Sequence, residues 1–562
     1  MNYKKYLSGV LAAAMVLNTG AVSVLAAGTD TSVQEASQTQ TSSTPETVYV
    51  NSYDGKERSV SFNDHWRFYL GELNGAEAVS YNDSSWDDVT LPHDYSIDQG
   101  FSTAAPAEQE SGYVLGGTGW YRKSFTLDES MQGKTISIDF DGVYMNAAVY
   151  LNGEKLGTHP YGYTPFSFVL PQDKLKFIHI SGTNGKGSEL AFLSEILTKS
   201  GYRTGRYISP TLYSYRERIQ VDKEMIDRDS LAKLTTKVKE AIDGMLADGL
   251  QSPTVFEVET AISFLYFVEK QCDIVVLETG LGGTLDATNV VTTTVLEVIA
   301  SIGMDHMMFL GNTLGEIAKN KAGIIKQGTL VVSAKQEPEA EEVVKKVSEE
   351  KHATLSIVNP EEIKDVHYGY ETQRFSYKNW KDIEISLAGT YQIKNAALAL
   401  EAVEALRSLG YQLSEETVRK GMKEATWRGR FSVIHKDPVV VIDGAHNPAA
   451  ATVLKESLET YFKGKNLYYI FGVFADKDYE KVIELTAPLA KQIVTVQTPN
   501  NPRALPAEEL KKAVEKVNPN VKAAKSVAEA VEEVKAMTTK DDVVIVFGSL
   551  SFLSLADEAW NR

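Results

Sequence analysis

The chain has 562 residues, which is enough for roughly three or four domains of ordinary size. Its 75 acidic residues outnumber its 57 lysines and arginines, and the formal net charge of -18 argues against binding to nucleic acid or to an anionic membrane surface. A single cysteine, Cys272, rules out an intrachain disulfide and a cluster of thiolate metal ligands. We expect Cys272 to be a small packing residue.

The N-terminus has the pattern of an export signal. A basic start is followed by apolar residues 7–25 and by a small-residue cleavage pattern at 24–26. Polar residues at 18–20 interrupt the apolar run, so we expect a signal peptide over 1–27 rather than a membrane anchor. Residues 28–48 are rich in Ser, Thr and Gln and are expected to form a disordered tether.

Residues 49–171 are expected to form an all-β domain. Residues 134–140 alternate polar and apolar side chains, and the Asn152-Gly153 pair separates two short strand-like runs. Alternation with period two is typical of strands with one buried face, and Asn-Gly is a strong signal for a tight hairpin. The pattern therefore predicts a β-sandwich.

Several motifs follow one another in this part of the chain. They are Trp66-Arg67-Phe68, Trp86-Asp87-Asp88, Leu91-Pro92-His93-Asp94, Gly119-Trp120-Tyr121-Arg122, residues 141–146 and Tyr161-Gly162-Tyr163. The series resembles the N-terminal sugar-binding domain of family 2 glycoside hydrolases of the β-galactosidase type. The resemblance implies a jelly roll, truncated near Leu170, with weak carbohydrate binding.

The rest of that family's architecture does not follow Leu170. Glycosidic cleavage in the family needs two carboxylates held in a TIM barrel, and no candidate barrel follows, so we rank glycosidase activity last. For Trp66, Trp86 and Trp120 we favour packing in the core over stacking against a sugar.

Residues 177–188 are the most informative stretch of the chain. An apolar strand runs into a glycine-rich turn, Lys186 and Ser188 follow, and a helical pattern begins at once. Glycines let backbone N–H groups close around phosphate oxygens, the helix N-terminus adds a positive dipole, and the lysine reaches the β- and γ-phosphates. The stretch predicts ATP binding, although Gly187 separates Lys186 from Ser188, which are adjacent in the common motif.

From residue 172 onward, strand-like apolar runs alternate with helical segments. Residues 273–277, 296–302 and 439–442 are strand-like, whereas 231–246 and 396–409 have helical periodicity. This alternation predicts α/β domains with mostly parallel sheets.

A second series of motifs runs through this half. It comprises residues 182–188, Ser209-Pro210, Glu217-Arg218-Ile219, residues 277–283, residues 285–289, residues 301–306, Leu310-Gly311, residues 321–326, Gln392 with Asn395-Ala396, residues 427–430, residues 443–448 and Asp476-Lys477-Asp478. The series is similar to folylpolyglutamate synthase/dihydrofolate synthase, a branch of the Mur ligase superfamily. The resemblance covers about 175–562 and implies a central ATP-binding domain over 172–426 and a Rossmann-like C-terminal domain over 427–562.

The resemblance implies an ATP-dependent amide ligase that adds L-glutamate to a folate or dihydropteroate through an acyl phosphate. In such chemistry charge builds on phosphate oxygens, so cations and Mg²⁺ do most of the work. Two alternatives stay open: a Mur-type ligase with another substrate, such as a cell-wall precursor, and an exported carbohydrate-binding protein with an inactive ligase passenger.

The resemblance also assigns residues to roles. Lys186, Lys321 and His306 are catalytic candidates. Nucleotide contacts are expected from Thr183, Asn184, Gly185, Lys186, Gly187, Ser188, Asn395, Arg430 and Asp443. Mg²⁺ ligands are expected at Ser209, Glu278 and His306, with a carbamylated Lys321 at a second Mg²⁺. Phe256 and Asp286 match the pterin side of the substrate pocket. Trp427 either belongs to the site or packs the linker between domains.

This chain departs from the family in three places. Thr211 and Thr284 stand where the family has His and Arg, and β-sandwich sequence replaces the helical start of the ligase. The change occurs within residues 165–176, so we interpret the chain as a truncated fusion. The export signal and the ATP chemistry conflict, and we place the ligase half in the cytoplasm as a monomer.

Overall fold

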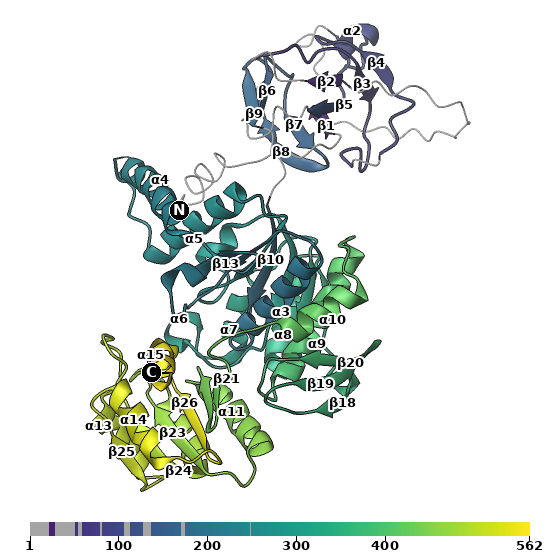
Figure 1. Ribbon diagram of the computed structural model, residues 1–562. Helices are drawn as coiled ribbons and strands as arrows, with labels where there is room; N and C mark the ends of the chain where they lie inside the picture. Colours follow the sequence, from purple (N-terminus) through teal and green to yellow (C-terminus); the bar gives the residue numbers. More distant parts are fainter. Residues whose placement is uncertain are drawn as a thin grey trace. The chain divides into compact units, whose positions relative to one another are not determined.

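The computed structural model describes residues 22–28, 51–53, 59–78, 81–105, 113–127, 136–169, 175–247 and 249–561 (Figure 1). The chain divides into two compact units, and the boundary between them follows Lys174. Among the described residues no helix has both the length and the apolar character needed to cross a membrane.

The described residues of the first unit form two β-sheets. The larger has the strand order β4-β3-β5-β1-β7-β8, with β2 also paired to β5, and the smaller pairs β6 with β9. The bounds are β1 (Val22–Gly28), β2 (Asn51–Tyr53), β3 (Trp66–Leu70), β4 (Asp87–Val89), β5 (Gly119–Leu127), β6 (Ser137–Phe140), β7 (Ala147–Leu151), β8 (Glu154–His159) and β9 (Phe166–Val169), with a short helix α2 (Tyr95–Asp98).

The two sheets share one core. Trp66 of β3 and Val149 of β7 belong to the same cluster as Ile138 of β6, so apolar side chains from both sheets pack together. Trp66, Trp86 and Trp120 are only 2%, 5% and 8% exposed, which confirms that these tryptophans pack in the core. The jelly-roll assignment stays a prediction.

Strand β1 lies where the sequence places the end of an export signal. Val22–Gly28 pairs with β5 along its whole length and with β7 over Val24–Ala27. An apolar run suits a strand paired on both sides as well as it suits a signal peptide, so this pattern alone does not separate the two. Residues 1–21 and 29–48 lie outside the described residues, so the signal peptide and the tether stay predictions.

The second unit begins with an eight-stranded sheet of order β13-β12-β11-β14-β10-β15-β16-β17, parallel except at the β12 and β13 edge. Its strands are β10 (Lys176–Ser181), β11 (Thr204–Tyr207), β12 (Ile219–Val221), β13 (Glu224–Met225), β14 (Ile274–Glu278), β15 (Thr294–Ile299), β16 (Leu330–Ser333) and β17 (Thr354–Ile357). Its helices are α3 (Lys186–Lys199), α4 (Arg228–Ala247), α5 (Val255–Glu269), α6 (Met307–Leu310), α7 (Leu314–Ala322) and α8 (Pro338–Glu350).

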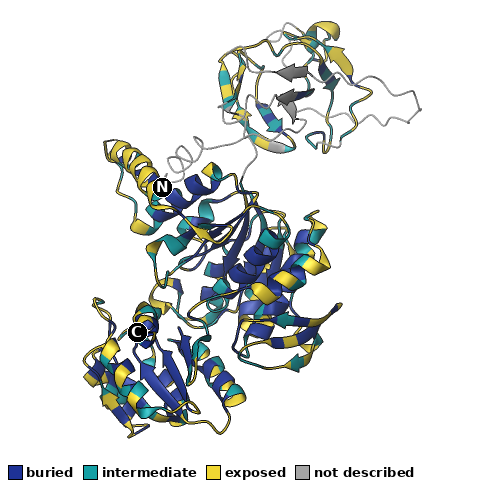
Figure 2. Ribbon diagram, viewed as in Figure 1, coloured by how far each residue is buried: buried dark blue, intermediate teal, exposed yellow. Residues whose placement is uncertain are grey.

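The position of β10 decides where a ligand can bind. It lies between β14 and β15, which come later in the chain, so connections leave it toward both sides. In parallel α/β sheets ligands bind at the carboxyl ends of strands where such a reversal occurs. The glycine-rich loop follows β10 at that edge. Figure 2 shows the sheet in the buried colour, in keeping with a core in which Ile178 and Ile180 of β10 meet Leu193 of α3.

A small antiparallel sheet and two helices complete this domain. The strands are β18 (Ile363–His367), β19 (Gln373–Tyr377) and β20 (Trp380–Ile385), and the helices are α9 (Gln392–Ser408) and α10 (Glu415–Glu424). Phe375 of β19 and Leu398 of α9 belong to the same core as the central sheet.

The C-terminal domain has a six-stranded sheet of order β21-β22-β26-β23-β24-β25, parallel except for β21. Its strands are β21 (Ser432–Lys436), β22 (Val439–Asp443), β23 (Leu467–Phe471), β24 (Ala490–Thr495), β25 (Val521–Ala523) and β26 (Val543–Phe547). Its helices are α11 (Pro448–Tyr461), α12 (Tyr479–Thr486), α13 (Ala507–Glu515), α14 (Val527–Met537) and α15 (Leu550–Trp560). The α/β class predicted for this half is confirmed.

Candidate active site

The glycine-rich loop takes a conformation that needs its glycines. Gly182 and Gly185 have φ of +149° and +96°, and Gly185 is the N-cap of α3. A Cβ on Gly182 would also lie 2.8 Å from the Ala300 Cβ. The backbone N–H groups of Thr183 and Asn184 donate to the Ser301 carbonyl at 2.8 and 3.1 Å, which fastens the loop to the end of β15. The loop therefore presents the N-terminus of a fourteen-residue helix as a rigid anion site.

Two oppositely charged side chains meet beside this loop. Lys186 Nζ lies 4.0 Å from Glu278 Oε1, and both side chains are largely buried. The Ser209 N–H donates to Glu278 Oε2 at 3.3 Å. Burial lowers the pKa of Lys186 and raises the pKa of Glu278, and the charge of each opposes the shift of the other. The site thus holds a cation and a carboxylate whose charges are poorly solvated, a state that a charged ligand would relieve.

Lys321 of α7 lies on the other side of the loop. It is 4% exposed, and its Nζ donates to the Gly182 carbonyl at 2.8 Å. Burial, and then the positive charge of Lys186, lower the pKa of Lys321 to about 7. A lysine with this pKa is partly neutral near physiological pH, so its amine is nucleophilic.

His306 faces a different carboxylate from the one that the sequence suggests. It has a left-handed φ of +52°, its N–H donates to Asp305 Oδ1 at 2.8 Å, and its Nε2 lies 3.9 Å from Asp305 Oδ2. In the described part of the chain no hydrogen bond or ion pair joins the His306 imidazole to Glu278, and no cluster of three His, Cys, Asp or Glu side chains is arranged to hold a metal. Ser209 and Glu278 are therefore in direct contact, whereas the described contacts of His306 are with Asp305.

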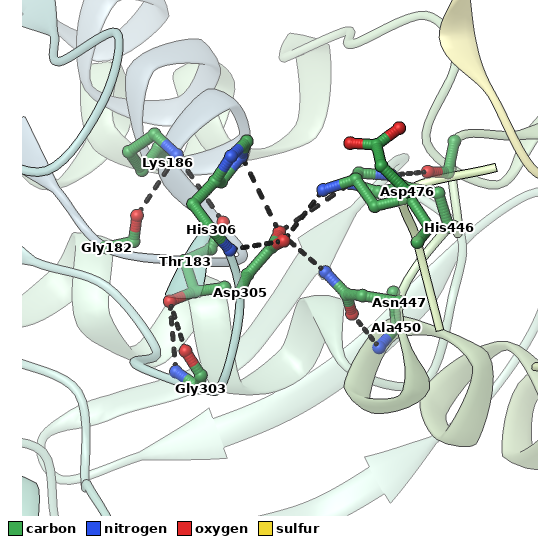
Figure 3. A network of polar contacts seen from close by, with 12 residues as sticks. Gly182, Thr183, Lys186, Gly303, Asp305, His306, His446, Asn447, Ala450 and Asp476 are labelled. Carbon is green, nitrogen blue, oxygen red and sulfur yellow. Dashed lines mark hydrogen bonds and ion pairs between the residues drawn. The ribbon is translucent and has the colours of Figure 1, made fainter. Parts of the chain in front are cut away.

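Asp305 is the centre of the polar network in Figure 3. Its carboxylate accepts from Lys477 Nζ at 2.8 Å and from Asn447 Nδ2 at 3.2 Å, and His446 Nε2 lies 3.7 Å away. Burial alone would raise the pKa of Asp305, but hydrogen bonds from His446 and Lys477 hold it well below its usual range. Asp305 follows β15 of the central domain, whereas its partners follow β22 and β23, so the network joins the two ligase domains.

The sequence contained Asp305 and Lys477 within recognised motifs but did not single them out. A carboxylate in the loop that follows a buried strand, and a lysine between two aspartates, are signals for a polar site. Neither signal says which residue of a remote domain is the partner.

Two nucleotide candidates lie close to the loop. A Cβ on Gly185 would come 3.0 Å from Asn395 Oδ1, so that amide stands over the N-terminus of α3. The positive charge of Arg430 contributes to the pKa shifts of Lys186, Glu278 and Asp443, which locates the guanidinium near all three groups.

Asp443, another of the expected nucleotide contacts, has two backbone partners. It is 4% exposed, and its oxygens accept the N–H groups of Phe431 and Ala445, both at 2.7 Å. Burial raises its pKa, and Arg430 partly offsets the rise. In this structure Asp443 therefore joins the linker between the domains to the loop after β22.

Trp427 packs against Gly187, the glycine that separates Lys186 from Ser188. A Cβ on Gly187 would lie 2.5 Å from Trp427 Nε1, Cε2 and Cζ2. The indole thus occupies the space that any larger residue at 187 would need, which gives a physical reason for glycine between Lys186 and Ser188. It also makes Trp427 a packing residue of the linker at the edge of the site.

We expect Gly187→Ala to cost about 1–3 kcal/mol, because the stiff indole must move to admit a methyl group. Urea unfolding and ATP titration would measure the loss of stability and of affinity. Gly244→Ala is the matched control, since nothing lies within 4 Å of a Cβ at that helical position. Unchanged stability and ATP affinity in Gly187→Ala would mean that the indole of Trp427 does not pack tightly against residue 187.

The substrate candidates lie on the loop after β14 and on the helix that faces it. A Cβ on Gly280 would come 2.5 Å from the Phe256 ring, and the Arg218 guanidinium lies 5.8 Å from the centroid of that ring. Asp286 is in the same loop and contributes to the pKa shifts of both Lys186 and Lys321. The backbone N–H and the side-chain hydroxyl of Thr284, one of the departures, both donate to the Asn320 carbonyl in the last turn of α7.

Comparison with known proteins places this half of the chain. Residues 180–403 match the family described as Mur ligase middle domain, and residues 429–550 match Mur ligase, glutamate ligase domain. Dihydrofolate synthase/folylpolyglutamate synthase of Bacillus subtilis is 35% identical over 394 residues, which span 68% of this chain and 90% of that protein. Folylpolyglutamate synthase of Lacticaseibacillus casei is 34% identical over 343 residues, which span 60% of this chain and 80% of that protein.

Solved structures agree with the sequence relatives. Mycobacterium tuberculosis folylpolyglutamate synthase complexed with ADP and AMPPCP superposes with a TM-score of 0.64 at 29% identity, covering 69% of this chain and 92% of that one. E. coli FolC in complex with DHPP and ADP superposes with a TM-score of 0.61 at 31% identity, covering 69% and 88%.

Proposed function

Because the chain belongs to the dihydrofolate synthase/folylpolyglutamate synthase family of Mur ligases, we propose that it is an ATP-dependent ligase that joins L-glutamate to a carboxylate of a folate or dihydropteroate. The observation that carries the proposal is the group of buried Lys186, Glu278 and Lys321 around a phosphate-binding loop at the carboxyl edge of the central sheet. The relatives and their nucleotide complexes support the same chemistry.

The reaction has two steps. The substrate carboxylate attacks the γ-phosphorus of ATP, the bond to the β-phosphate oxygen breaks, and ADP leaves with an acyl phosphate formed. The amine of glutamate then attacks the acyl carbon, phosphate leaves with the bonding electron pair, and the amine loses a proton. Lys186 and Arg430 supply positive charge where the phosphate oxygens gather negative charge, and Asn395, whose Nδ2 donates to Gln392 Oε1, stands over the helix N-terminus.

The residues near the loop fit a magnesium ion in part. Mg²⁺ prefers oxygen ligands and keeps several waters, and the Glu278 carboxylate lies beside Ser209. We assign Ser209, Glu278 and His306 as the residues that would hold it. When bound, the ion would neutralise charge on the triphosphate.

We further propose that Lys321 is carbamylated. Only a neutral amine can attack CO₂, and a pKa of about 7 leaves a sizeable neutral fraction at physiological pH. The amine nitrogen bonds to the carbon of CO₂ and loses a proton, which turns a buried cation into an anion able to hold a second Mg²⁺.

We expect ¹³C-bicarbonate to produce a carbamate resonance in the wild-type protein that is absent from Lys321→Met. Lys319→Met is the matched control, because Lys319 is exposed on the same helix. We expect Lys321→Met to lower kcat by about 100-fold, the order found when one transition-state charge is lost. A carbamate signal that survives in Lys321→Met would contradict the assignment.

For the substrate we propose that the pteridine end lies against Phe256 and Asp286, with Thr183, Asn184, Gly185, Gly187 and Ser188 around the phosphates. ADP release from the purified full chain, dependent on dihydropteroate or a folate and on L-glutamate, tests the function. Release driven by a muramyl acceptor instead would favour the Mur-type alternative, and no release with any acceptor would overturn the ligase assignment.

For the first unit we propose a truncated jelly roll related to glycoside hydrolase sugar-binding domains. The motif series and the shared core of its two sheets support this. Binding of the full chain to galactosides or glucuronides would test it. We place the ligase reaction in the cytoplasm, where ATP and folates are found, and treat export as the alternative; the chain would act as a monomer.

A further inference from the structure

A fully buried histidine lies directly beneath the phosphate loop. His179 of β10 is flanked by Leu277 of β14 and Glu297 of β15, and none of it is exposed. Its neighbours in the strand, Ile178 and Ile180, are apolar core residues. An imidazole in such a place needs a hydrogen-bonding partner, because burying an unpaired polar group is costly.

The hydrogen-bonding partner of His179 lies on the loop after β14, which carries the substrate candidate Asp286. His179 Nε2 is 2.8 Å from Thr288 Oγ1, and both side chains are wholly buried. The Thr288 hydroxyl donates to Asp286 Oδ1 at 2.5 Å, and the Thr288 N–H donates to the same oxygen at 3.0 Å. The Leu281 N–H donates to Asp286 Oδ2 at 2.7 Å. A chain of hydrogen bonds thus runs from the core to the carboxylate.

The number of available protons determines which group donates in each of these hydrogen bonds. A threonine hydroxyl has one proton, and here the carboxylate accepts it, so Thr288 Oγ1 must accept from His179. His179 is therefore the Nε2–H tautomer, and its Nδ1 has no partner among the described residues. Burial, and then the charge of Lys326, lower the pKa of His179 to about 3, in keeping with a neutral ring.

The carboxylate held in this way keeps spare acceptor capacity. A carboxylate offers about four lone-pair sites, and the Leu281 and Thr288 donors use three of them. Asp286 is partly exposed, and its negative charge partly opposes the lowering of the pKa of Lys186 and of Lys321. It is thus an acceptor fixed by its loop and within electrostatic reach of both lysines.

We propose that His179 is a positioning residue for substrate binding: through Thr288 it fixes the Asp286 carboxylate in the orientation that accepts N–H donors of the substrate heterocycle. The proposal rests on the proposed function for the identity of the substrate. It assigns a role to a histidine that touches neither nucleotide nor substrate. The chemistry it selects is a planar ring edge that presents N–H groups, as a pteridine does.

Two matched pairs of variants isolate the hydrogen bonds from packing. Glutamine can place an N–H where His179 has Nε2, whereas asparagine places its N–H at the Nδ1 position. His179→Gln therefore keeps the hydrogen bond to Thr288, and His179→Asn breaks it. Thr288→Ser keeps the hydroxyl, whereas Thr288→Val replaces it with a methyl group of similar size.

The first measurement needs no substrate. Nitrogen-15 NMR of the histidine-labelled protein should show a neutral Nε2–H ring for His179 over pH 6–8. Amide exchange of residues 281–289 should rise at least tenfold in His179→Asn and Thr288→Val, and stay near wild type in the two conservative variants. An Nδ1–H tautomer, or equal exchange in all four variants, would overturn the proposal.

The second measurement separates this proposal from the proposed function. We expect the breaking variants to bind dihydropteroate about tenfold more weakly and to raise its KM, with ADP affinity and the KM for ATP unchanged. Asp286→Asn combined with His179→Asn should be no weaker than Asp286→Asn alone. Failure of the wild type to bind dihydropteroate would reject the proposed function, whereas wild-type affinity in His179→Asn would reject the positioning role.

Discussion

Replacing Lys186 by methionine is expected to lower kcat/KM for ATP on the order of 100- to 1,000-fold, because the substitution removes the cation that the loop aims at the β- and γ-phosphates. The Lys186 side chain is 16% exposed, and its Nζ now rests against Glu278 and the Gly182 carbonyl. In so dry a site a charge interacts more strongly with phosphate than it would in water. Methionine keeps the length and apolar character of the stem, so packing is preserved.

The measurement is ATP affinity by calorimetry together with turnover. Lys199→Met is the matched control, since Lys199 ends the same helix but pairs with Glu424 and lies far along the helix from the loop. The control should retain ATP affinity within about twofold. Wild-type ATP affinity in Lys186→Met would show that the loop does not bind the triphosphate through this lysine.

The second large effect is expected at the contact between the ligase domains. Lys477 and Asp305 are 9% and 11% exposed and lie 2.8 Å apart, so each is the main counter-charge of the other. Truncating one member of a buried, hydrogen-bonded pair costs about 2–5 kcal/mol, much of it from the charge left behind. Lys477→Met should therefore shift the two domains toward an open arrangement and lower kcat/KM by about 30-fold or more.

Distance between fluorophores on exposed Lys346 and Lys516, each changed to cysteine, would report the arrangement directly. Cys272 is buried and should not compete for the label. Asp305→Asn should have an effect similar to Lys477→Met, and the double variant should cost less than the sum. Arg503→Met is the control, because the Arg503–Asp476 pair lies within the C-terminal domain and is about half exposed. Equal distances in wild type and Lys477→Met would contradict a closing role.

The phosphate loop was predictable because its chemistry lies in consecutive residues. Strand β10 and helix α3 flank residues 182–185 as expected, since the glycines, the lysine and the helix start act within one turn of chain. The helices expected at 231–246 and 396–409 are α4 and α9, with ends within a few residues. The order of the strands in the sheet could not be predicted from the sequence, because it depends on the direction in which each connecting helix crosses the face of the sheet.

Other features needed the folded chain. Glu278 and Ser209 could be assigned by resemblance, but their contact and the pairing of His306 with Asp305 appear only in three dimensions. Trp427 had two interpretations of equal weight until its indole was found against Gly187. The N-terminal apolar segment suited both a signal and a strand, and pairing with β5 and β7 is a property of other parts of the chain.

The ligase assignment of the second half came from its resemblance to a known family. From the order of its residues alone, this protein could be assigned an α/β half with a phosphate-binding loop and a β-rich segment before it, because these properties depend on local backbone preferences and on periodicity, which neighbouring residues set. Tertiary structure decided the charge states and partners: Asp305 meets Lys477 across 172 residues, and His179 meets Thr288 across 109. Desolvation and Coulomb interactions act through space, so they exist only once remote segments have folded together.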